Sequence, residues 1–449
     1  MEVRDTLSSS LKRVESTRGK RINMFVCGPT VYDLPHMGHA RTYIFFDILA
    51  RYLRFKGFRV FYLMNITDIE DHIITRAKEE GIQWDSITSR YSNEFFKTME
   101  DIKNNSVNLY AFATDYISEI ISQISRLIEA GYAYETSDGI YFRVRKFEGY
   151  GKLSHQNLDS LKAGIRVDVN EHKEDPLDFA LWKKRKEGEP YWPSPWGDGR
   201  PGWHIEDTAI TESIFGVTYD IHGGATDLIF PHHEAEIAQM ESISGKSPMV
   251  RYWIHTGHLN VENIKMSKSL KNFITVKEVL KNYWPEALRI LMLSMRYNGP
   301  VNFEEKALRD SQNLAEKISI LSHRVARAER VENDKSMEML NDILKPLEDD
   351  MNTPEALARI TEFVKDSLSS TTPSDTNGGE IRYVLDQLEN VTGIVHNVPL
   401  PERSLDMLLD LRNEMRNKGN YESSDLIRKR LMEYGIRIED TTNGSYLWW

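Results

Sequence analysis

Apolar positions between residues 22 and 66 follow a strand–helix–strand order. Ile22, Met24, Phe25 and Val26 form a short apolar run that predicts a buried strand. From residue 44 to 53, apolar side chains recur at intervals of three and four, which predicts a helix that stops at Gly57. Residues 58–66 are a second strand-like run. Two strands joined through a helix pair in parallel, so the pattern predicts a βαβ unit.

The alternation of strand and helix signals is interrupted after residue 110 and resumes near residue 200. There, Tyr219–Gly224 predicts a strand ending in a glycine turn, Phe230–Glu236 a helix start, and Trp253–Thr256 a last core strand. From Glu304 onward the pattern is nearly all helical. The fold class is therefore α/β: a doubly wound, Rossmann-like parallel-sheet domain with an insertion, then an α-helical bundle and a small C-terminal domain. The expected boundaries are 1–110 with 200–260 for the split domain, 111–199 for the insertion, 261–303 for a loop and two helices, 304–395 for the bundle, and 396–449 for the C-terminal domain.

Composition narrows the class of protein. The chain has 449 residues and a net charge of −11, which argues against a uniformly basic nucleic-acid coat but leaves room for local patches. Arginines and lysines near aromatic residues at the C-terminus indicate either such a patch or a solvated helix face. No apolar run is long enough to span a bilayer and no signal-peptide core is visible, so we expect a cytoplasmic protein. The single cysteine, Cys27, excludes an internal disulfide.

Two cationic motifs indicate phosphate chemistry. His36-Met-Gly38-His39 falls where a helix starts at the carboxyl end of a predicted parallel strand. A helix start offers free N–H groups to a phosphate, and Gly38 permits close approach of a planar group. The second motif, Lys265-Met-Ser-Lys268-Ser, lies far downstream. HMGH followed at this distance by KMSKS resembles the two signatures of class I aminoacyl-tRNA synthetases.

A metal site is a second theme at the same sheet edge. His232 and Glu236 are four positions apart, so they would project from one helix face, and both side chains can bind zinc. Alone, such a pair is usually a hydrogen-bonded surface pair. Cys27, at the end of the first strand, would add a thiolate and favours the metal interpretation.

Longer strings make the resemblance more specific. CGPTVYD (27–33), NITD (65–68), DPLDFALWK (175–183), GRPGWHIE (199–206), DIHGG (220–224), FPHHE (230–234) and DDMNTPEALA (349–358) are similar to segments of cysteinyl-tRNA synthetases, and together they cover nearly the whole chain. The resemblance implies activation of L-cysteine by ATP to cysteinyl-adenylate, with Mg²⁺ accompanying ATP. It also implies transfer of the cysteinyl group to tRNA(Cys) by a monomer.

The family's metal ligands map onto Cys27, His232 and Glu236, and the implied cofactor is one Zn²⁺ per subunit that reads the substrate thiol. The fourth ligand is normally a cysteine, but this chain has Asp207. Aspartate can bind zinc, so we expect a Cys/Asp/His/Glu site. A carboxylate hardens the site, and weaker retention, another metal or no metal remain alternatives.

The resemblance also implies the remaining site residues. The catalytic residues are His36, His39, Lys265 and Lys268, and the residues that bind ATP are His36, Gly38, His39 and Lys268. Gly28, Thr30, Thr67, Trp203 and His222 are expected to line the cysteine pocket, although Trp203 could be plain core and His222 a satisfied buried histidine. Two rival functions are a cysteine ligase that acts on an amino sugar, as in the mycothiol pathway, and a non-catalytic RNA-binding relative.

Overall fold

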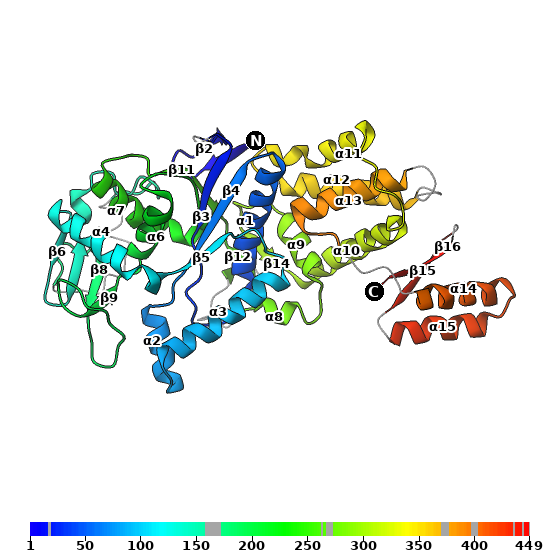
Figure 1. Ribbon diagram of the computed structural model, residues 1–449, viewed down its shortest axis with the longest axis horizontal. Helices are drawn as coiled ribbons and strands as arrows, with labels where there is room; N and C mark the ends of the chain where they lie inside the picture. The colour runs from blue at the N-terminus through cyan, green and yellow to red at the C-terminus, as the bar shows by residue number, and fades with distance from the viewer. Residues whose placement is uncertain are drawn as a thin grey trace. The chain divides into compact units, whose positions relative to one another are not determined.

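The computed structural model describes residues 1–16, 19–157, 172–261, 264–265, 273–369, 377–396, 403–433, 436–441 and 444–448. The chain divides into two compact units: Met1–Val279 with Tyr297–Asn302, and Leu280–Arg296 with Phe303–Trp449 (Figure 1). The finer domain boundaries expected from the sequence stay a prediction. Within the described ranges, no helix is long and apolar enough to cross a membrane.

A five-stranded parallel sheet forms the centre of the first unit and confirms the predicted α/β class. Its strand order is β11-β10-β3-β4-β5, and every neighbouring pair runs in parallel. The strands are β3 (Arg21–Val26), β4 (Arg59–Ile66), β5 (Leu109–Phe112), β10 (Tyr219–Ala225) and β11 (Val250–Thr256). Residues at the carboxyl ends of β3, β4 and β10 therefore meet at one edge, where open α/β sheets bind ligands.

Helices join these strands and bury apolar faces against the sheet (Figure 1). The first, α1, keeps Ile44, Phe46, Ile48 and Leu49 fully buried, as its three- and four-residue spacing predicted. The helices of this unit are α1 (Met37–Phe55), α2 (Asp71–Glu80), α3 (Trp84–Asp101), α4 (Ile117–Glu129), α6 (Ile205–Phe215), α7 (Glu234–Ser244) and α8 (Val276–Val279).

A four-stranded antiparallel sheet, β6-β7-β8-β9, interrupts the parallel one, and Trp182 and Phe142 are buried in its core. Its strands are β6 (Ala133–Glu135), β7 (Gly139–Phe142), β8 (Phe179–Lys184) and β9 (Gly199–Pro201). An N-terminal hairpin of β1 (Glu2–Asp5) and β2 (Ser10–Arg13) attaches to β11 through the bond from the Thr6 amide to the Trp253 carbonyl, 2.8 Å. Three short strands, β12 (Leu259–Val261), β13 (Ile264–Lys265) and β14 (Val301–Phe303), form a further small sheet.

The second unit is helical, as predicted from residue 304 onward. Its long helices are α9 (Pro285–Leu293), α10 (Glu305–Val325), α11 (Asp334–Leu344), α12 (Thr353–Ser369) and α13 (Gly378–Thr392). The C-terminal part adds α14 (Arg403–Asn417), α15 (Tyr421–Glu433), β15 (Arg437–Thr441) and β16 (Gly444–Trp448). Arg412 is fully buried in this last part and pairs with both oxygens of Asp440, each at 2.6 Å.

Two local predictions were wrong. Gly223 and Gly224 do not form a turn, because β10 continues through both to Ala225. A Cβ on Gly223 would lie 2.2 Å from the ring of Phe46, so this glycine permits close packing of α1 on the sheet. The helix predicted from Phe230 starts later: Phe230 is extended, Ile229–His233 forms a π-turn, and regular α-helix begins at Glu234.

Candidate active site

His36 and His39 form the cap of α1. The Nδ1 of His36 accepts the Gly38 amide at 3.0 Å, and the Nδ1 of His39 accepts the His36 amide at 3.2 Å, a reciprocal capping box. The two rings stack with centroids 3.8 Å apart. Because each Nδ1 is an acceptor, a neutral ring must carry its proton on Nε2. The cap thus turns two histidines into paired donors at the N-terminus of a 19-residue helix.

A cavity of about 360 Å³ lies over these histidines. It brings together seven of the residues predicted from the sequence: Cys27, Gly28, Thr30, His36, Gly38, His39 and Trp203. The other lining residues are Pro29, Tyr32, Asp33, Leu34, Thr42, Tyr43, Ala225, Asp227, Leu228, Gly257, His258 and Leu259. One cavity therefore holds both the HMGH motif and the thiol at the end of β3.

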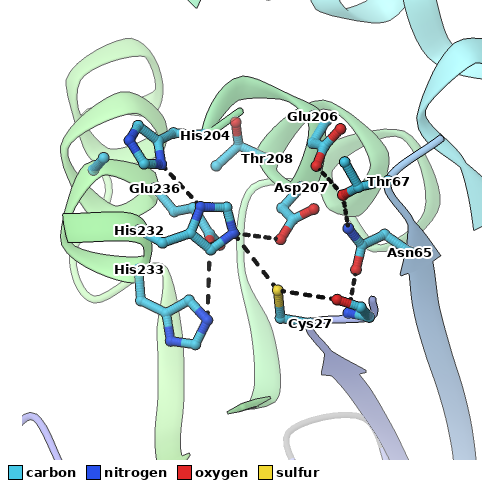
Figure 2. Close-up of polar contacts among 12 residues, drawn as sticks. Cys27, Asn65, Thr67, His204, Glu206, Asp207, Thr208, His232, His233 and Glu236 are labelled. Atoms are coloured by element: carbon cyan, nitrogen blue, oxygen red, sulfur yellow. Dashed lines mark hydrogen bonds and ion pairs between the residues drawn. The ribbon is translucent and has the colours of Figure 1, made fainter. Parts of the chain in front are cut away.

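Four buried donor groups meet beside this cavity (Figure 2). The Nε2 of His232 lies 3.6 Å from Cys27 Sγ, 3.0 Å from Asp207 Oδ2 and 3.3 Å from Glu236 Oε1. Asp207 comes from the first turn of α6, and Glu236 from the first turn of α7. The four expected metal ligands are thus brought together, although His232 lies in the π-turn and not on regular helix.

The electrostatics of this cluster fit a cation. Burial raises the pKa of the Cys27 thiol well above its usual value, and the carboxylates of Asp207 and Glu236 raise it further. Burial and Asp207 also raise the pKa of Glu236. Asp207 Oδ1 and both oxygens of Glu236 are buried and make no hydrogen bond to the described residues. Acidic donors crowded together without a counter-charge are typical of a metal site.

Several overlapping groups of three residues in this cluster have ligand atoms close enough together to hold one metal ion. Among the described residues, three sets each have ligand atoms within 4.8 Å of one another: Asp207/His232/Glu236, Cys27/His232/His233 and His222/His233/Glu236. The structure therefore supports a possible metal centre of mixed sulfur, nitrogen and oxygen donors. Such a set suits a borderline metal such as zinc.

A hydrogen-bond chain fixes the end of β4 beside the same cavity. The Gly28 amide donates to Asn65 Oδ1 at 2.5 Å, Asn65 Nδ2 donates to Thr67 Oγ1 at 3.4 Å, and the Thr67 hydroxyl donates to Glu206. A Cβ on Gly28 would lie 1.7 Å from the Asn65 carbonyl oxygen, so only glycine fits. The single hydroxyl proton of Thr67 is used in the bond to Glu206, so this hydroxyl can only accept a hydrogen bond from a ligand.

Trp203 and His222 each contact one member of the donor cluster, Trp203 the ring of His232 and His222 the carboxylate of Glu236. The Trp203 ring stacks on His232 with centroids 4.3 Å apart and stays 38 % exposed, so it is a surface of the site and not plain core. His222 is fully buried on β10, its Nδ1 2.7 Å from the Tyr219 hydroxyl. Thr30 pairs with Thr67 through a parallel backbone bridge.

The KMSKS motif is described only in part. Lys265 ends β13, where its backbone pairs with Asn260. Lys268 lies outside the described residues, so its expected approach to His36 and His39 stays a prediction.

Sequence reasoning expected His204 at this sheet edge but gave it no role, and it missed Glu206 and His233. His204 Nδ1 lies 2.8 Å from His232 Nδ1, Glu206 holds Thr67, and His233 belongs to two of the donor sets. The signal was present, because the first two lie in GWHIE directly before Asp207 and the third follows His232. Their roles depend on which face of α6 and α7 turns inward, which residue spacing alone did not reveal.

Known proteins resemble this chain at the level of family and fold. Residues 13–313 match the family model described as tRNA synthetases class I (C) catalytic domain. Cysteine–tRNA ligase of Thermoplasma volcanium is 47% identical over 458 residues, and that of Thermoplasma acidophilum 48% identical over 462 residues, each alignment covering 100% of both chains. Among solved structures, Mycobacterium tuberculosis methionyl-tRNA synthetase with methionyl-adenylate has a TM-score of 0.61 at 16% identity, covering 90% of this chain and 96% of its own. At that identity the structural likeness supports the fold alone.

Proposed function

The chain belongs to the cysteine–tRNA ligase family of class I aminoacyl-tRNA synthetases, and we propose that it joins L-cysteine to tRNA(Cys) in two steps. In the first step the cysteine carboxylate attacks the α-phosphorus of ATP, and pyrophosphate leaves. In the second step a hydroxyl of the tRNA's terminal adenosine attacks the acyl carbon, and AMP leaves. One observation supports this most directly: the HMGH histidines and Cys27 line the same cavity.

The α1 cap is suited to the first step. The attack builds negative charge on the phosphate oxygens, and the Nε2–H groups of His36 and His39 are donors held in place by their own backbone bonds. Gly38 lets the nucleotide approach the helix start. Lys265 and Lys268 are proposed to neutralise the departing pyrophosphate, and Mg²⁺ accompanies ATP. The chain's contribution is positioning and charge stabilisation, with no covalent intermediate on the protein.

The cysteine pocket is proposed to lie between the ends of β3 and β4. Thr67 can accept a hydrogen bond from the α-ammonium group of the substrate, because its proton is committed to Glu206. Gly28 and Thr30 shape the floor, Trp203 covers one side, and His222 lies behind the pocket. This arrangement orients the carboxylate toward the α1 cap.

Cys27, Asp207, His232 and Glu236 would hold a metal ion, which we propose to be Zn²⁺. When bound, zinc supplies a borderline-soft Lewis acid that favours a thiolate over the hydroxyl of serine. An apolar pocket alone separates such near-isosteres poorly. His204 fixes the ring of His232 through its Nδ1, so that Nε2 faces the other donors.

The remaining parts are proposed to serve tRNA. Residues 111–199 would approach the acceptor end. The helical bundle, 304–395, and the C-terminal domain, 396–449, would approach the anticodon side. The T. volcanium relative aligns over 100% of both chains, including this C-terminal part, which favours tRNA over an amino sugar as acceptor. Action in the cytoplasm fits the family. Sedimentation of the purified protein would test the monomeric state expected from the sequence.

The test compares cysteine and serine in pyrophosphate exchange and in charging of a tRNA(Cys) transcript, with metal content measured on the same preparation. We expect cysteine-dependent exchange, charging of tRNA(Cys), rejection of serine and about one zinc per chain. Loss of cysteine-dependent exchange would refute an activating enzyme. Exchange without charging would instead favour the amino-sugar ligase.

A further inference from the structure

Two buried imidazole nitrogens, on neighbouring rings, each lie near a different oxygen of the Glu236 carboxylate. His222 Nε2 lies 3.6 Å from Oε2, and His233 Nε2 lies 3.9 Å from Oε1. All four atoms are fully buried, and none makes a hydrogen bond to the residues that the structure describes. Whether each nitrogen carries a proton decides whether Glu236 meets attraction or repulsion.

The first of these rings is anchored by Tyr219. Its hydroxyl lies 2.7 Å from His222 Nδ1, on the side of the ring away from Glu236. Tyr219 and His222 are three positions apart on β10, and both are buried. If the tyrosine hydroxyl donates to Nδ1, the proton of a neutral ring must be on Nε2, which faces the carboxylate.

The second ring is anchored at the N-terminal hairpin, through one more histidine. Thr6 Oγ1 lies 2.7 Å from His255 Nδ1, and His255 Nε2 lies 2.8 Å from His233 Nδ1. Two hydrogen bonds hold this anchor in place: the Thr6 amide donates to the Trp253 carbonyl at 2.8 Å, and the Trp253 amide donates to the Asp5 carboxylate at 2.9 Å. If the Thr6 hydroxyl donates to His255 Nδ1, the His255 Nε2–H donates to His233 Nδ1. The proton of a neutral His233 ring is then on Nε2, which faces Glu236.

The opposite polarity is unfavourable. It would place an unprotonated nitrogen against each oxygen of Glu236, so that lone pairs face lone pairs in a buried site. His222, His233 and His255 are all buried, and burial disfavours the charged form of an imidazole, so each neutral ring must adopt one tautomer. Glu236 therefore favours the arrangement in which the Tyr219 and Thr6 hydroxyls each donate to the histidine Nδ1 beside them. The N–H groups at His222 Nε2 and His233 Nε2 then face the carboxylate.

We propose that Tyr219 and Thr6 are positioning residues whose hydroxyls turn an N–H toward each oxygen of Glu236: Tyr219 acts through His222, and Thr6 through His255 and His233. The inference rests on the proposed function. Each carboxylate oxygen has two lone pairs, so a facing N–H leaves one for a metal ion. Glu236 is thereby held in one orientation, and metal retention and cysteine binding depend on two hydroxyls outside the cavity lining.

The test uses holoenzyme of four variants. Tyr219→Phe and Thr6→Val each remove one anchoring hydroxyl, and Thr6→Ser restores it. The matched control is Tyr252→Phe, because the Tyr252 hydroxyl is buried on the neighbouring strand and bonds the Arg13 carbonyl at 2.7 Å instead. The readouts are the rate of zinc release to a chromophoric chelator, KM for cysteine and for ATP in pyrophosphate exchange, and the thermal midpoint.

We expect Tyr219→Phe and Thr6→Val to release zinc about tenfold faster and to raise KM for cysteine about fivefold, with KM for ATP unchanged. Thr6→Ser and Tyr252→Phe should behave as wild type. Unchanged zinc release in both hydroxyl deletions would overturn the inference, as would an equal effect of Tyr252→Phe. A wild-type protein that charges cysteine but holds no metal would overturn it too, and would leave the proposed function standing.

Discussion

Cys27 and His232 lie 205 positions apart in the chain, yet Sγ of one is 3.6 Å from Nε2 of the other. The approach follows from topology, because β3 and β10 are neighbouring parallel strands and the π-turn carrying His232 follows β10. A thiol and an imidazole at this distance can share one cation. The proposed metal site thus depends on the order of strands in the sheet.

At the proposed metal site, the carboxylate of Asp207 is a harder, less polarisable donor than the second thiolate of a set with two cysteines would be. We expect Asp207→Cys to slow zinc release to a chelator, because a thiolate binds zinc more strongly than a carboxylate, and Asp207→Asn to weaken retention by at least about tenfold. Release is measured at fixed pH on zinc-loaded protein. Glu212→Gln on the same helix is the control, because Glu212 pairs with Arg126. Equal release from the Asp207→Asn and wild-type proteins would mean that Asp207 is not a ligand.

A substitution at His36 can separate its role as the N-cap of α1 from its proposed contact with the phosphate. Asparagine is a good N-cap, so His36→Asn should keep the acceptor for the Gly38 amide and leave the thermal midpoint unchanged. It removes the imidazole N–H, so kcat of pyrophosphate exchange should fall by about 100- to 1,000-fold while KM for cysteine changes little. A large rise in KM for cysteine with kcat intact would contradict a role at the phosphate.

Thr67 should act through its hydroxyl alone. Thr67→Val keeps the shape of the side chain but removes the acceptor proposed for the substrate ammonium group, so KM for cysteine should rise about 10- to 100-fold, as for a lost hydrogen bond to a charged group. Thr67→Ser keeps the bond to Glu206 and should restore most of the affinity. The comparison is made at saturating ATP, and failure of serine to rescue would point to packing instead.

The sequence allowed the sheet, the start of α1 at the HMGH motif and four converging donors to be predicted, because periodicity and motif order report on elements and on the edge where they end. It did not reveal that Tyr219 and Thr6 stand behind Glu236. The Thr6 contact depends on how the N-terminal hairpin and β11 meet, a tertiary arrangement with no local signal. The glycines of DIHGG were misread for a similar reason: Gly223 packs against Phe46, a partner far away in the sequence.

Asp68 provides a test of stability that is independent of any metal. Its carboxylate accepts the Thr114 amide at 3.0 Å and the Thr114 hydroxyl at 2.5 Å. Burial nevertheless dominates and raises the pKa of Asp68 from 3.8 to about 6. Between these two values the folded protein binds more protons than the unfolded chain, so stability falls as pH rises through this window. The penalty is complete above pH 6 and amounts to about 3 kcal/mol.

Asp68→Asn should remove that penalty without losing the contacts, because an amide can accept the Thr114 N–H with its oxygen and donate to the Thr114 hydroxyl. We therefore expect the variant to unfold at a higher temperature than wild type at pH 8. Near pH 4 the difference in unfolding free energy between variant and wild type should shrink to less than about 1 kcal/mol. Calorimetry at both pH values measures it. Asp101→Asn, at an exposed position, should show no such pH-dependent gain. A gain of equal size at pH 4 and pH 8 would show that the amide improves packing, and that desolvation of the Asp68 carboxylate is not the cause.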